Sequence, residues 1–153
     1  MIHFSCTVND FLPVPTDSVR WLDQEADFIS AQAFWLELGQ PLSRKTWDMA
    51  HQFGYSYAAI LLGRRILASA AAWRFSPDCW EVAAVSTLPA FRHQGYSMRV
   101  VAFVTSYILQ SGKLATCCTD DDNAAMIATA RSVGFQVIPR EKVWWSFPDL
   151  SDF

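Results

Sequence analysis

The chain has 153 residues, a formal net charge of −3 and a pI near 5.5. Neutralising phosphate requires a basic surface, so this charge argues against a nucleic-acid partner and suits a cationic or amine partner better. Hydrophobic residues make up 52% of the chain and charged residues 18%, which excludes the composition of a disordered protein. We therefore expect one domain over residues 1–153, with enough apolar surface for a homodimer interface.

Targeting and metal-binding patterns are absent from the sequence. Residues 1–30 lack a basic region followed by an apolar core, and no run of about 18 apolar residues occurs. The cysteines show neither CxxC spacing nor paired histidines, so no zinc site or disulfide framework is indicated. We expect a cytoplasmic protein with free thiols, no metal and no membrane partner. These cysteines are Cys6, Cys79, Cys117 and Cys118.

The first third of the chain is expected to contain one strand and two helices. Residues 2–8 alternate imperfectly, as a strand would, and two prolines then force an irregular connection. Residues 18–38 carry apolar side chains at helical spacing, which predicts one helix, broken or continuous. A second helix is predicted over residues 43–53, with Ser43 as its N-cap.

Three consecutive antiparallel strands are predicted next. Residues 55–62 and 65–73 are apolar runs separated by Gly63-Arg64, a dipeptide typical of a tight hairpin turn. The turn sequence Ser76-Pro77-Asp78 then leads into a third run, residues 79–87.

A glycine loop follows this third strand and opens an amphipathic helix. The loop is Arg92-His93-Gln94-Gly95-Tyr96-Ser97, and the helix after it has apolar residues at helical spacing up to Gly112. The first turn of a helix has free N–H groups and the positive end of the helix dipole, so it attracts anions. Gly95 would let a phosphate approach the backbone closely. The order strand, glycine loop and helix therefore predicts a phosphate site.

The last part of the chain is predicted as strand 114–119, helix 123–133 and a closing hairpin of residues 135–138 and 143–147. Asp120 to Asp122 would cap the helix, although they could also attract a cationic ligand. The passage from strand 79–87 through a helix to strand 114–119 needs a crossover, so these fourth and fifth strands should be parallel neighbours. The fold class is α+β, with a mixed, mostly antiparallel sheet and helices on both faces.

The residues of the loop and of the segments around it carry a family resemblance. The run Val85 to Ser97, VSTLPAFRHQGYS, resembles the acetyl-CoA signature of the GCN5-related N-acetyltransferases: Arg or Gln, two residues, Gly, one residue, then Gly or Ala. Asn123 and Gly134-Phe135 resemble the helix and strand that follow in that family. The resemblance covers about residues 55–147. It implies a single-domain acetyltransferase-like fold, with residues 55–147 as the cofactor-binding core and 1–54 as the acceptor-side region.

The resemblance also implies where acetyl-CoA, the acyl donor, would bind. The pyrophosphate would lie on the loop N–H groups, with Arg92 beside it, and the pantetheine arm would pair with the preceding strand as an added strand would. Asn123 would bond to the pantetheine or hold the following turn. Ser97 replaces the usual Gly or Ala and adds a hydroxyl. The alternative is an ordinary helix cap without a ligand. The implied cofactor-binding residues are Val85, Ser86, Thr87, Arg92, His93, Gln94, Gly95, Tyr96, Ser97 and Asn123.

The chemistry requires a base, because a lysine-like amine with a pKa near about 10.4 is protonated at neutral pH. Related enzymes often have a Glu at the start of the cofactor strand that orients water, so Glu81 is the candidate. The alternative is a strand-end carboxylate that faces solvent. Strand parity groups Glu81 with Val85 and Thr87, unless a bulge reverses its face. A backbone N–H near Val85 would stabilise the oxyanion.

No proton donor for the leaving thiolate is identified. The family commonly uses a tyrosine seven residues after the helix asparagine, and that position is Ala130 here. His51 could line an acceptor pocket or be a surface residue, and His93 is expected to be exposed. Cys117 and Cys118 point to opposite faces of a strand and are interpreted as core thiols. Trp144-Trp145 could line the acceptor pocket or a dimer interface.

The predicted function is transfer of an acetyl group from acetyl-CoA to a primary amine by direct attack. A small-molecule acceptor is favoured and a protein or peptide amine comes next. The alternative from another class is a non-catalytic acyl-CoA-binding or regulatory module, which the missing tyrosine makes conceivable. A third option is an unrelated nucleotide-binding domain.

Overall fold

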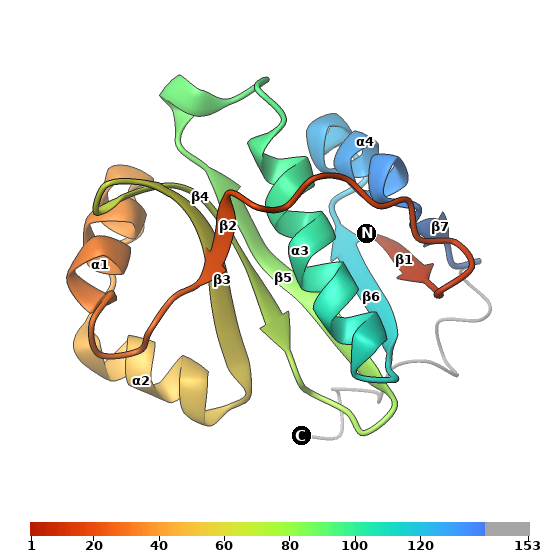
Figure 1. Cartoon of the computed structure of the whole chain (residues 1–153), viewed down its shortest axis with the longest axis horizontal. Helices are drawn as coiled ribbons and strands as arrows, with labels where there is room; N and C mark the ends of the chain where they lie inside the picture. Colours follow the sequence, from red (N-terminus) through yellow and green to blue (C-terminus); the bar gives the residue numbers. More distant parts are fainter. Residues whose placement is uncertain (140–153) are drawn as a thin grey trace.

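The computed structural model describes residues 1–139, which form a mixed sheet between two pairs of helices. The strand order is β2-β3-β4-β5-β6-β1-β7. Figure 1 shows α3 lying across the sheet, and α1 and α2 grouped beside β3 and β4. The elements are β1 Ile2–Cys6, β2 Val19–Trp21, α1 Phe28–Glu37, α2 Arg44–Gln52, β3 Tyr55–Leu62, β4 Arg65–Trp73, β5 Cys79–Thr87, the 3-10 helix η1 Pro89–Phe91, α3 Tyr96–Gln110, β6 Leu114–Thr119, α4 Ala124–Val133 and β7 Gln136–Val137.

The central strands have the predicted bounds and directions. β3, β4 and β5 pair antiparallel in succession, and β5 and β6 are the parallel pair that the crossover through α3 requires. The α+β class and the mostly antiparallel sheet are therefore confirmed.

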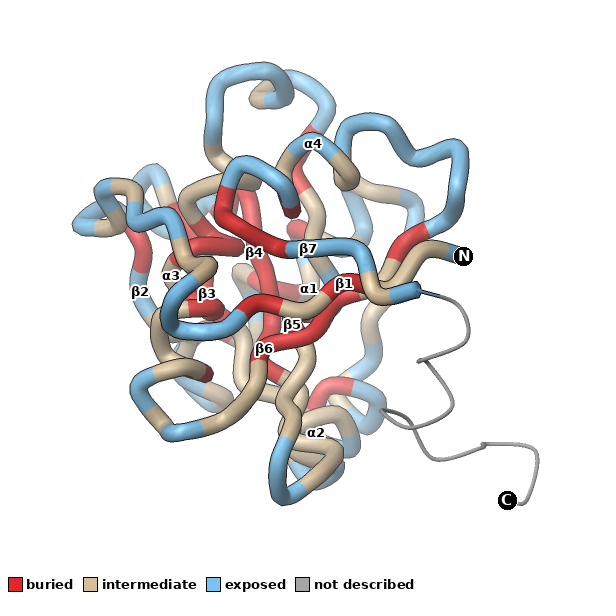
Figure 2. The backbone as a smooth tube through the Cα atoms, turned by 90° about the vertical axis from the view of Figure 1, so that its right-hand side faces the viewer, coloured by how far each residue is buried: buried red, intermediate tan, exposed pale blue. Residues whose placement is uncertain are grey.

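A hydrophobic core fills each side of the sheet. On one side, Val100, Val104 and Ile108 of α3 pack with α4 residues against the small side chains of β4. On the other side, Phe34 of α1 and Trp47 of α2 pack over β3 and β4. The buried segments in Figure 2 accordingly follow the central strands, while the loops are exposed.

The helix predicted over residues 18–38 is wrong in its first part. Val19–Trp21 form β2, which pairs with β3, and the helix begins only at Phe28. Trp21 packs edge-on against Phe103 and Tyr107 of α3, with ring centroids 5.2 and 4.8 Å apart. The unpaired edge of β3 and this aromatic contact outweigh the helical spacing, because local propensity is weaker than tertiary packing.

One expectation near the C-terminus needs correction, and a second is tested only in its first strand. The N-cap of α4 is Asn123, whose Oδ1 accepts a hydrogen bond from Met126 N at 3.1 Å, and not one of the preceding aspartates. Strand β7 forms within the predicted residues 135–138 and pairs on one side with β1, which lies between β6 and β7. Its predicted hairpin partner, residues 143–147, lies outside the described residues, as does Trp144-Trp145.

Gly134 closes α4 where the chain leaves no room for a side chain. Its φ is +104°, and a Cβ built there would lie 2.1 Å from the carbonyl oxygen of Asp10. The 7–12 loop is held at this point by Leu12 N, which donates to Val133 O at 3.0 Å. The glycine is needed both for its backbone angle and for this close approach.

Candidate functional site

Strands β5 and β6 separate and leave one edge of β5 open. Their pairing covers only Cys79–Glu81 with Leu114–Thr116, although the strands continue to Thr87 and Thr119. From Val82 onward, no strand among residues 1–139 pairs with β5 on the β6 side (Figure 1). Unpaired backbone groups of this kind are a template for an added strand or a peptide-like ligand.

A β-bulge lies in the open part of β5. Ser69 pairs with Ser86, but Ala71 pairs with Ala83, so Ala84 and Val85 together face one residue of β4. Ala84 has a φ of +52°. A bulge of this kind bends the strand and changes which side chains share a face.

The bulge reverses the face of Glu81 relative to the end of the strand. Cross-strand partners share a face, so Glu81, Ala83 and Ser86 lie on the α1–α2 side. Val85 packs with the core under α3, and Thr87 contacts α3. The grouping of Glu81 with Val85 and Thr87 by simple parity is therefore wrong, and Ser86 faces away from the two residues beside it.

The loop before α3 has the geometry of an anion site. Gly95, the N-cap, has a φ of +80°, and His93 has a φ of +63°. The first helical hydrogen bond runs from Arg99 N to Gly95 O at 3.2 Å, and the backbone N–H groups of residues 93–98 donate to no group within residues 1–139. A Cβ on Gly95 would meet nothing within 4 Å, so its backbone angle, and not a neighbouring side chain, requires glycine.

Side-chain contacts tie the end of β5 to this loop. The hydroxyls of Thr87 and Ser97 are 2.7 Å apart, and Arg92 Nε donates to Thr87 O at 3.2 Å. The ring of Tyr96 lies under the guanidinium of Arg99, 4.9 Å away. The open edge of β5 thus leads directly to the free N–H groups of the loop. The structure brings most of the sequence-predicted cofactor residues together here.

The structure also shows the local contacts of Asn123 and Ala130. The Oδ1 of Asn123 caps α4, which is the second of the two roles that the resemblance allowed. Asn123 follows the end of β6, and parallel strands end at the same edge of a sheet, so it lies at the edge where β5 also ends. Ala130 is fully buried in the core beside α3 and carries no proton donor.

Glu81 has its own surroundings on the other face. It lies opposite Trp73 of β4 and level with Thr116 of β6, and Cys118 comes two residues later on the same face. Burial raises the pKa of Glu81, and a hydrogen bond with the Cys118 thiol opposes that rise. Burial and the nearby Glu81 charge raise the pKa of Tyr55. Glu81 is therefore a half-buried carboxylate among strand side chains and not a solvated strand end.

The cysteine interpretation is right for one residue and wrong for the other. Cys117 is buried on the α3 side, as a core thiol should be. Cys118 is half-buried beside Glu81, and burial followed by the Glu81 charge raises its pKa to about 11. A protonated thiol at this position can donate to the carboxylate.

Sequence reasoning missed the aromatic neighbours of Glu81. Tyr55 and Trp73 are cross-strand partners, and their rings stack with centroids 5.3 Å apart. A two-residue turn at Gly63-Arg64 would pair Tyr55 with Ala72, the residue next to its actual partner. The predicted hairpin could therefore have located the neighbours of Glu81 to within one residue. The irregularity between Ile60 and Leu61 supplies the remaining shift.

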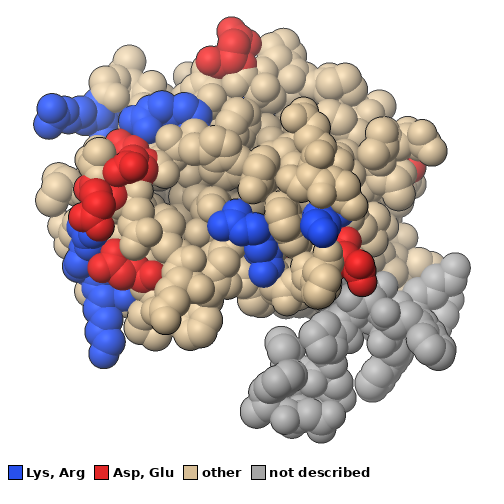
Figure 3. Space-filling view, turned by 60° about the horizontal axis from the view of Figure 1, so that its bottom comes forward, with Lys and Arg blue, Asp and Glu red and all other residues tan. Residues whose placement is uncertain are grey.

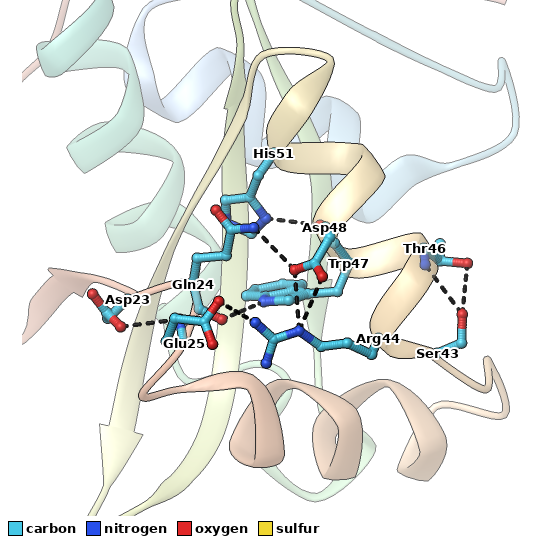
Figure 4. Close-up of polar contacts among 9 residues, drawn as sticks. All are labelled: Asp23, Gln24, Glu25, Ser43, Arg44, Thr46, Trp47, Asp48 and His51. Atoms are coloured by element: carbon cyan, nitrogen blue, oxygen red, sulfur yellow. Dashed lines mark hydrogen bonds and ion pairs between the residues drawn. The ribbon is translucent and has the colours of Figure 1, made fainter.

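The other candidate residues have structural partners. His51 Nδ1 is 2.8 Å from Trp47 O, and the His51 ring packs on the indole of Trp47. Figure 4 shows these residues with the polar contacts that join α2 to the 23–25 segment. Asp121 forms an ion pair with the N-terminal ammonium at 2.7 Å. His93 is exposed, as predicted.

The described part of the chain shows no second candidate site formed by a continuous charged surface or by metal ligands. In the view of Figure 3, basic side chains lie among acidic ones and do not form a continuous basic surface on that face. Residues 1–139 contain no group of three or more His, Cys, Asp or Glu that could hold a metal ion. No helix in this range is long and apolar enough to cross a membrane.

A family model described as FR47-like protein matches residues 61–145, more than half of the chain. The chain belongs to this family of the GCN5-related N-acetyltransferase (GNAT) type. No curated protein matches the sequence.

Solved structures of GNAT proteins share the fold. A putative GNAT acetyltransferase from Novosphingobium aromaticivorans superposes with a TM-score of 0.73 at 22% identity, over 90% of this chain and 59% of that one. The ribosomal-protein-S18-alanine N-acetyltransferase of Escherichia coli gives 0.64 at 18% identity, over 79% and 78%. AAC(6')-Iy in complex with a CoA bisubstrate analogue gives 0.65 at 14%, over 80% and 92%. The chain thus spans about three fifths of the Novosphingobium protein.

Proposed function

We propose that this GNAT domain transfers an acetyl group from acetyl-CoA to a primary amine of a small molecule. The observation that carries the proposal is the continuity between the open edge of β5 and the free N–H groups of residues 93–98. A long ligand with an amide-containing arm and a pyrophosphate fits such a path. Glu81 lies at the other end of the path, where β5 leaves β6.

In the proposed complex, backbone groups do most of the cofactor binding. The pyrophosphate rests on the N–H groups of His93 to Ser97, and the pantetheine amides pair with β5 near Val85 and Thr87. Arg92 and Ser97 hold the loop to the strand through Thr87. Asn123 keeps its cap and directs its amide N–H₂ toward the same edge.

The proposed reaction is direct attack of the amine on the thioester carbonyl. Glu81, through a water molecule, takes the ammonium proton, and the neutral amine forms the C–N bond. The oxyanion is stabilised by a backbone N–H near Val85. The C–S bond then breaks, coenzyme A leaves as a thiolate, and the attacking nitrogen gives up its second proton to that thiolate or to water, which leaves a neutral amide. A thiol pKa of about 8.5 makes this thiolate a fair leaving group, so Ala130 does not forbid turnover.

A second acceptor class and a second function are also considered. One of the similar structures is a ribosomal-protein-S18-alanine N-acetyltransferase and another holds the bisubstrate analogue CoA-S-monomethyl-acetylneamine, so a shared fold does not select the acceptor. A protein amine is the second acceptor class. The buried Ala130 favours a non-catalytic acyl-CoA-binding module as the second function.

The test is a thiol-release assay with acetyl-CoA and a panel of small amines and lysine peptides. Amine-dependent release of coenzyme A, with acetylated amine detected by mass spectrometry, would support the enzyme. Tight acetyl-CoA binding without release for any amine would favour the module. Binding of a dinucleotide without binding of coenzyme A would overturn both.

We further propose that the protein is a cytoplasmic homodimer. Its interface would lie in residues 1–54, the proposed acceptor-side region. Ile29 and Leu36 of α1 lie seven residues apart and are 72% and 61% exposed, which suits an interface across that helix. Light scattering of the purified chain tests this, and a monomer at all concentrations would contradict it.

A further inference from the structure

A cleft of about 620 Å³ lies between α1, β2 and the turn that joins β3 to β4. Figure 1 shows this turn beside α1. None of the residues that line the cleft comes from β5 or from the loop before α3, so it is separate from the proposed acetyl-CoA path. Sites for small organic ligands have volumes of about 300–1,000 Å³, and the cleft is therefore large enough for such a ligand.

Two ion pairs hold the ends of the cleft. At one end, Arg20 of β2 binds Asp27, the N-cap of α1, through two contacts of 2.9 and 3.1 Å. At the other end, Arg65 of β4 lies 2.8 Å from Glu37, the last residue of α1. The guanidinium of Arg65 also lies over the ring of Phe91, 5.3 Å from its centroid. The ten residues of α1 span about 15 Å, so the cleft is elongated and its charged ends are positioned before a ligand binds.

Unused donors lie in this cleft beside an apolar wall. Arg64 follows the turn glycine and lines the cleft together with Arg65, but its side chain forms no ion pair or hydrogen bond within residues 1–139. The hydroxyl of Ser30 also has no partner in that range. The wall is formed by Ala26, Ile29, Ala33, Phe34 and Ile66.

The charges in the cleft favour an anion. Three arginines and two carboxylates line it, which leaves one positive charge in excess, although the whole chain has a formal net charge of −3. The excess charge is that of Arg64, because the other two arginines are paired. A guanidinium binds a carboxylate through two parallel hydrogen bonds. One excess charge matches a monoanion, and the apolar wall matches an organic chain attached to it.

We propose that this cleft binds an elongated organic carboxylate, with its head on Arg64 and Arg65 and its apolar chain along Ala33 toward Ser30. The site is additional to the acetyl-CoA site, and the inference does not depend on the transferase function. Arg65 supplies a guanidinium that is already held in place, and Arg64 supplies the charge that the carboxylate neutralises.

The test is a ¹H–¹⁵N NMR titration with hexanoate, performed with saturating coenzyme A so that the loop before α3 is not a competing anion site, and repeated without it. The shifts are expected on the amides of residues 29–37 and 63–66. Hexanamide and hexylamine have the same chain and should bind at least about tenfold more weakly, because they lack the charge-assisted hydrogen bonds. Acetate lacks the chain and should also bind at least about tenfold more weakly.

Three variants test the role of charge. Arg64→Gln should weaken hexanoate binding by about tenfold. Glu37→Gln should strengthen it by up to about fivefold, because it removes a like charge and releases Arg65. Arg131→Gln is the matched control, since Arg131 lies in the last turn of α4 outside the cleft, and it should leave the affinity unchanged. The spectrum of each variant without hexanoate shows whether it is folded.

Equal binding of hexanamide, equal affinity in Arg64→Gln and Arg131→Gln, or weaker binding in Glu37→Gln would overturn the inference. Tighter binding of inorganic phosphate than of hexanoate would also overturn it, because the cleft would then be a site for an inorganic anion. Light scattering with and without hexanoate controls for the proposed dimer interface, which shares Ile29 with the cleft. The thiol-release assay tests the transferase function independently of all these results.

Discussion

The two faces of the central sheet differ in how they would recognise a ligand. On the α3 face, recognition would come from backbone: the unpaired edge of β5 and the N–H groups of residues 93–98. On the α1–α2 face, it comes from side chains of separate strands, with Glu81, Trp73 and Tyr55 side by side. The bulge at Ala84 and Val85 separates the two sets within one strand. A backbone site can serve one constant cofactor, whereas a side-chain site can be changed for each acceptor.

The largest effect is expected where a substitution removes catalysis and leaves cofactor binding unchanged. Glu81→Gln should lower kcat by about 10²- to 10⁴-fold, since it removes the proposed general base. Acetyl-CoA affinity, measured by calorimetry, should stay within about twofold, because Glu81 faces away from α3. A parallel loss of affinity would mean that the two faces are not independent.

The reverse separation is expected for Gly95→Ala. Gly95 and Gly112 have nearly equal φ angles of +80° and +78°, and neither has an atom within 4 Å of a built Cβ. Both substitutions therefore carry the same backbone strain, about 1–2 kcal/mol. Only Gly95→Ala should weaken acetyl-CoA binding, by about tenfold or about 1.4 kcal/mol. Equal affinities in the two variants would remove the loop from the site.

A smaller loss is expected at the contact between β5 and the loop. Thr87→Val removes the hydroxyl that lies 2.7 Å from Ser97 Oγ and keeps the shape of the side chain. The net value of such a hydrogen bond is about 1 kcal/mol, which corresponds to about fivefold weaker acetyl-CoA binding. Ser97→Ala should give a similar loss, and the double variant should lose little more than either single one. Fully additive losses would show that the two hydroxyls act separately.

The smallest effect concerns pH. The Cys118 hydrogen bond lowers the pKa of Glu81 against the upward effect of burial, so Cys118→Ala should raise this pKa further. Glu81 acts as a base only when ionised. The acidic limb of the kcat/KM profile should therefore move to higher pH, with reduced rates below the limb and unchanged rates above it. Cys118→Ser keeps a donor and should leave the limb in place. A limb that moves to lower pH would contradict this role for Cys118.

Sequence alone predicted the elements of the α3 face well and the side-chain neighbours on the other face poorly, for a physical reason. The loop before α3, its glycine and the helix after it are contiguous, so Gly95 and Ser97 can be recognised from local order. The strands β3, β4 and β5 were also predictable, because turn residues mark both of their connections. The neighbours of Glu81 depend on register, and two irregularities, one between β3 and β4 and one between β4 and β5, shift that register. A shift of one residue changes which side chains meet.

The elements that the sequence misplaced also depend on pairing between residues far apart in the chain. Val19–Trp21 became a strand because β3 offered an unpaired edge far away in sequence, with Val19 paired to Ile60 and Trp21 to Ala58. The position of β1 between β6 and β7 is equally non-local and has no signal in residues 2–8. Asn123 and the three aspartates before it are all good N-cap residues by type, so only the geometry could choose among them.

Backbone amide NMR of the chain during titration with coenzyme A tests whether the cofactor binds on the α3 side of the sheet and leaves the other face unaffected. We predict that the largest shifts fall on the amides of residues 93–98 and 83–87, while the indole N–H resonances of Trp47 and Trp73 stay nearly unchanged. Saturating coenzyme A that leaves the 93–98 amides unshifted, or that shifts mainly the two indoles, would contradict the account.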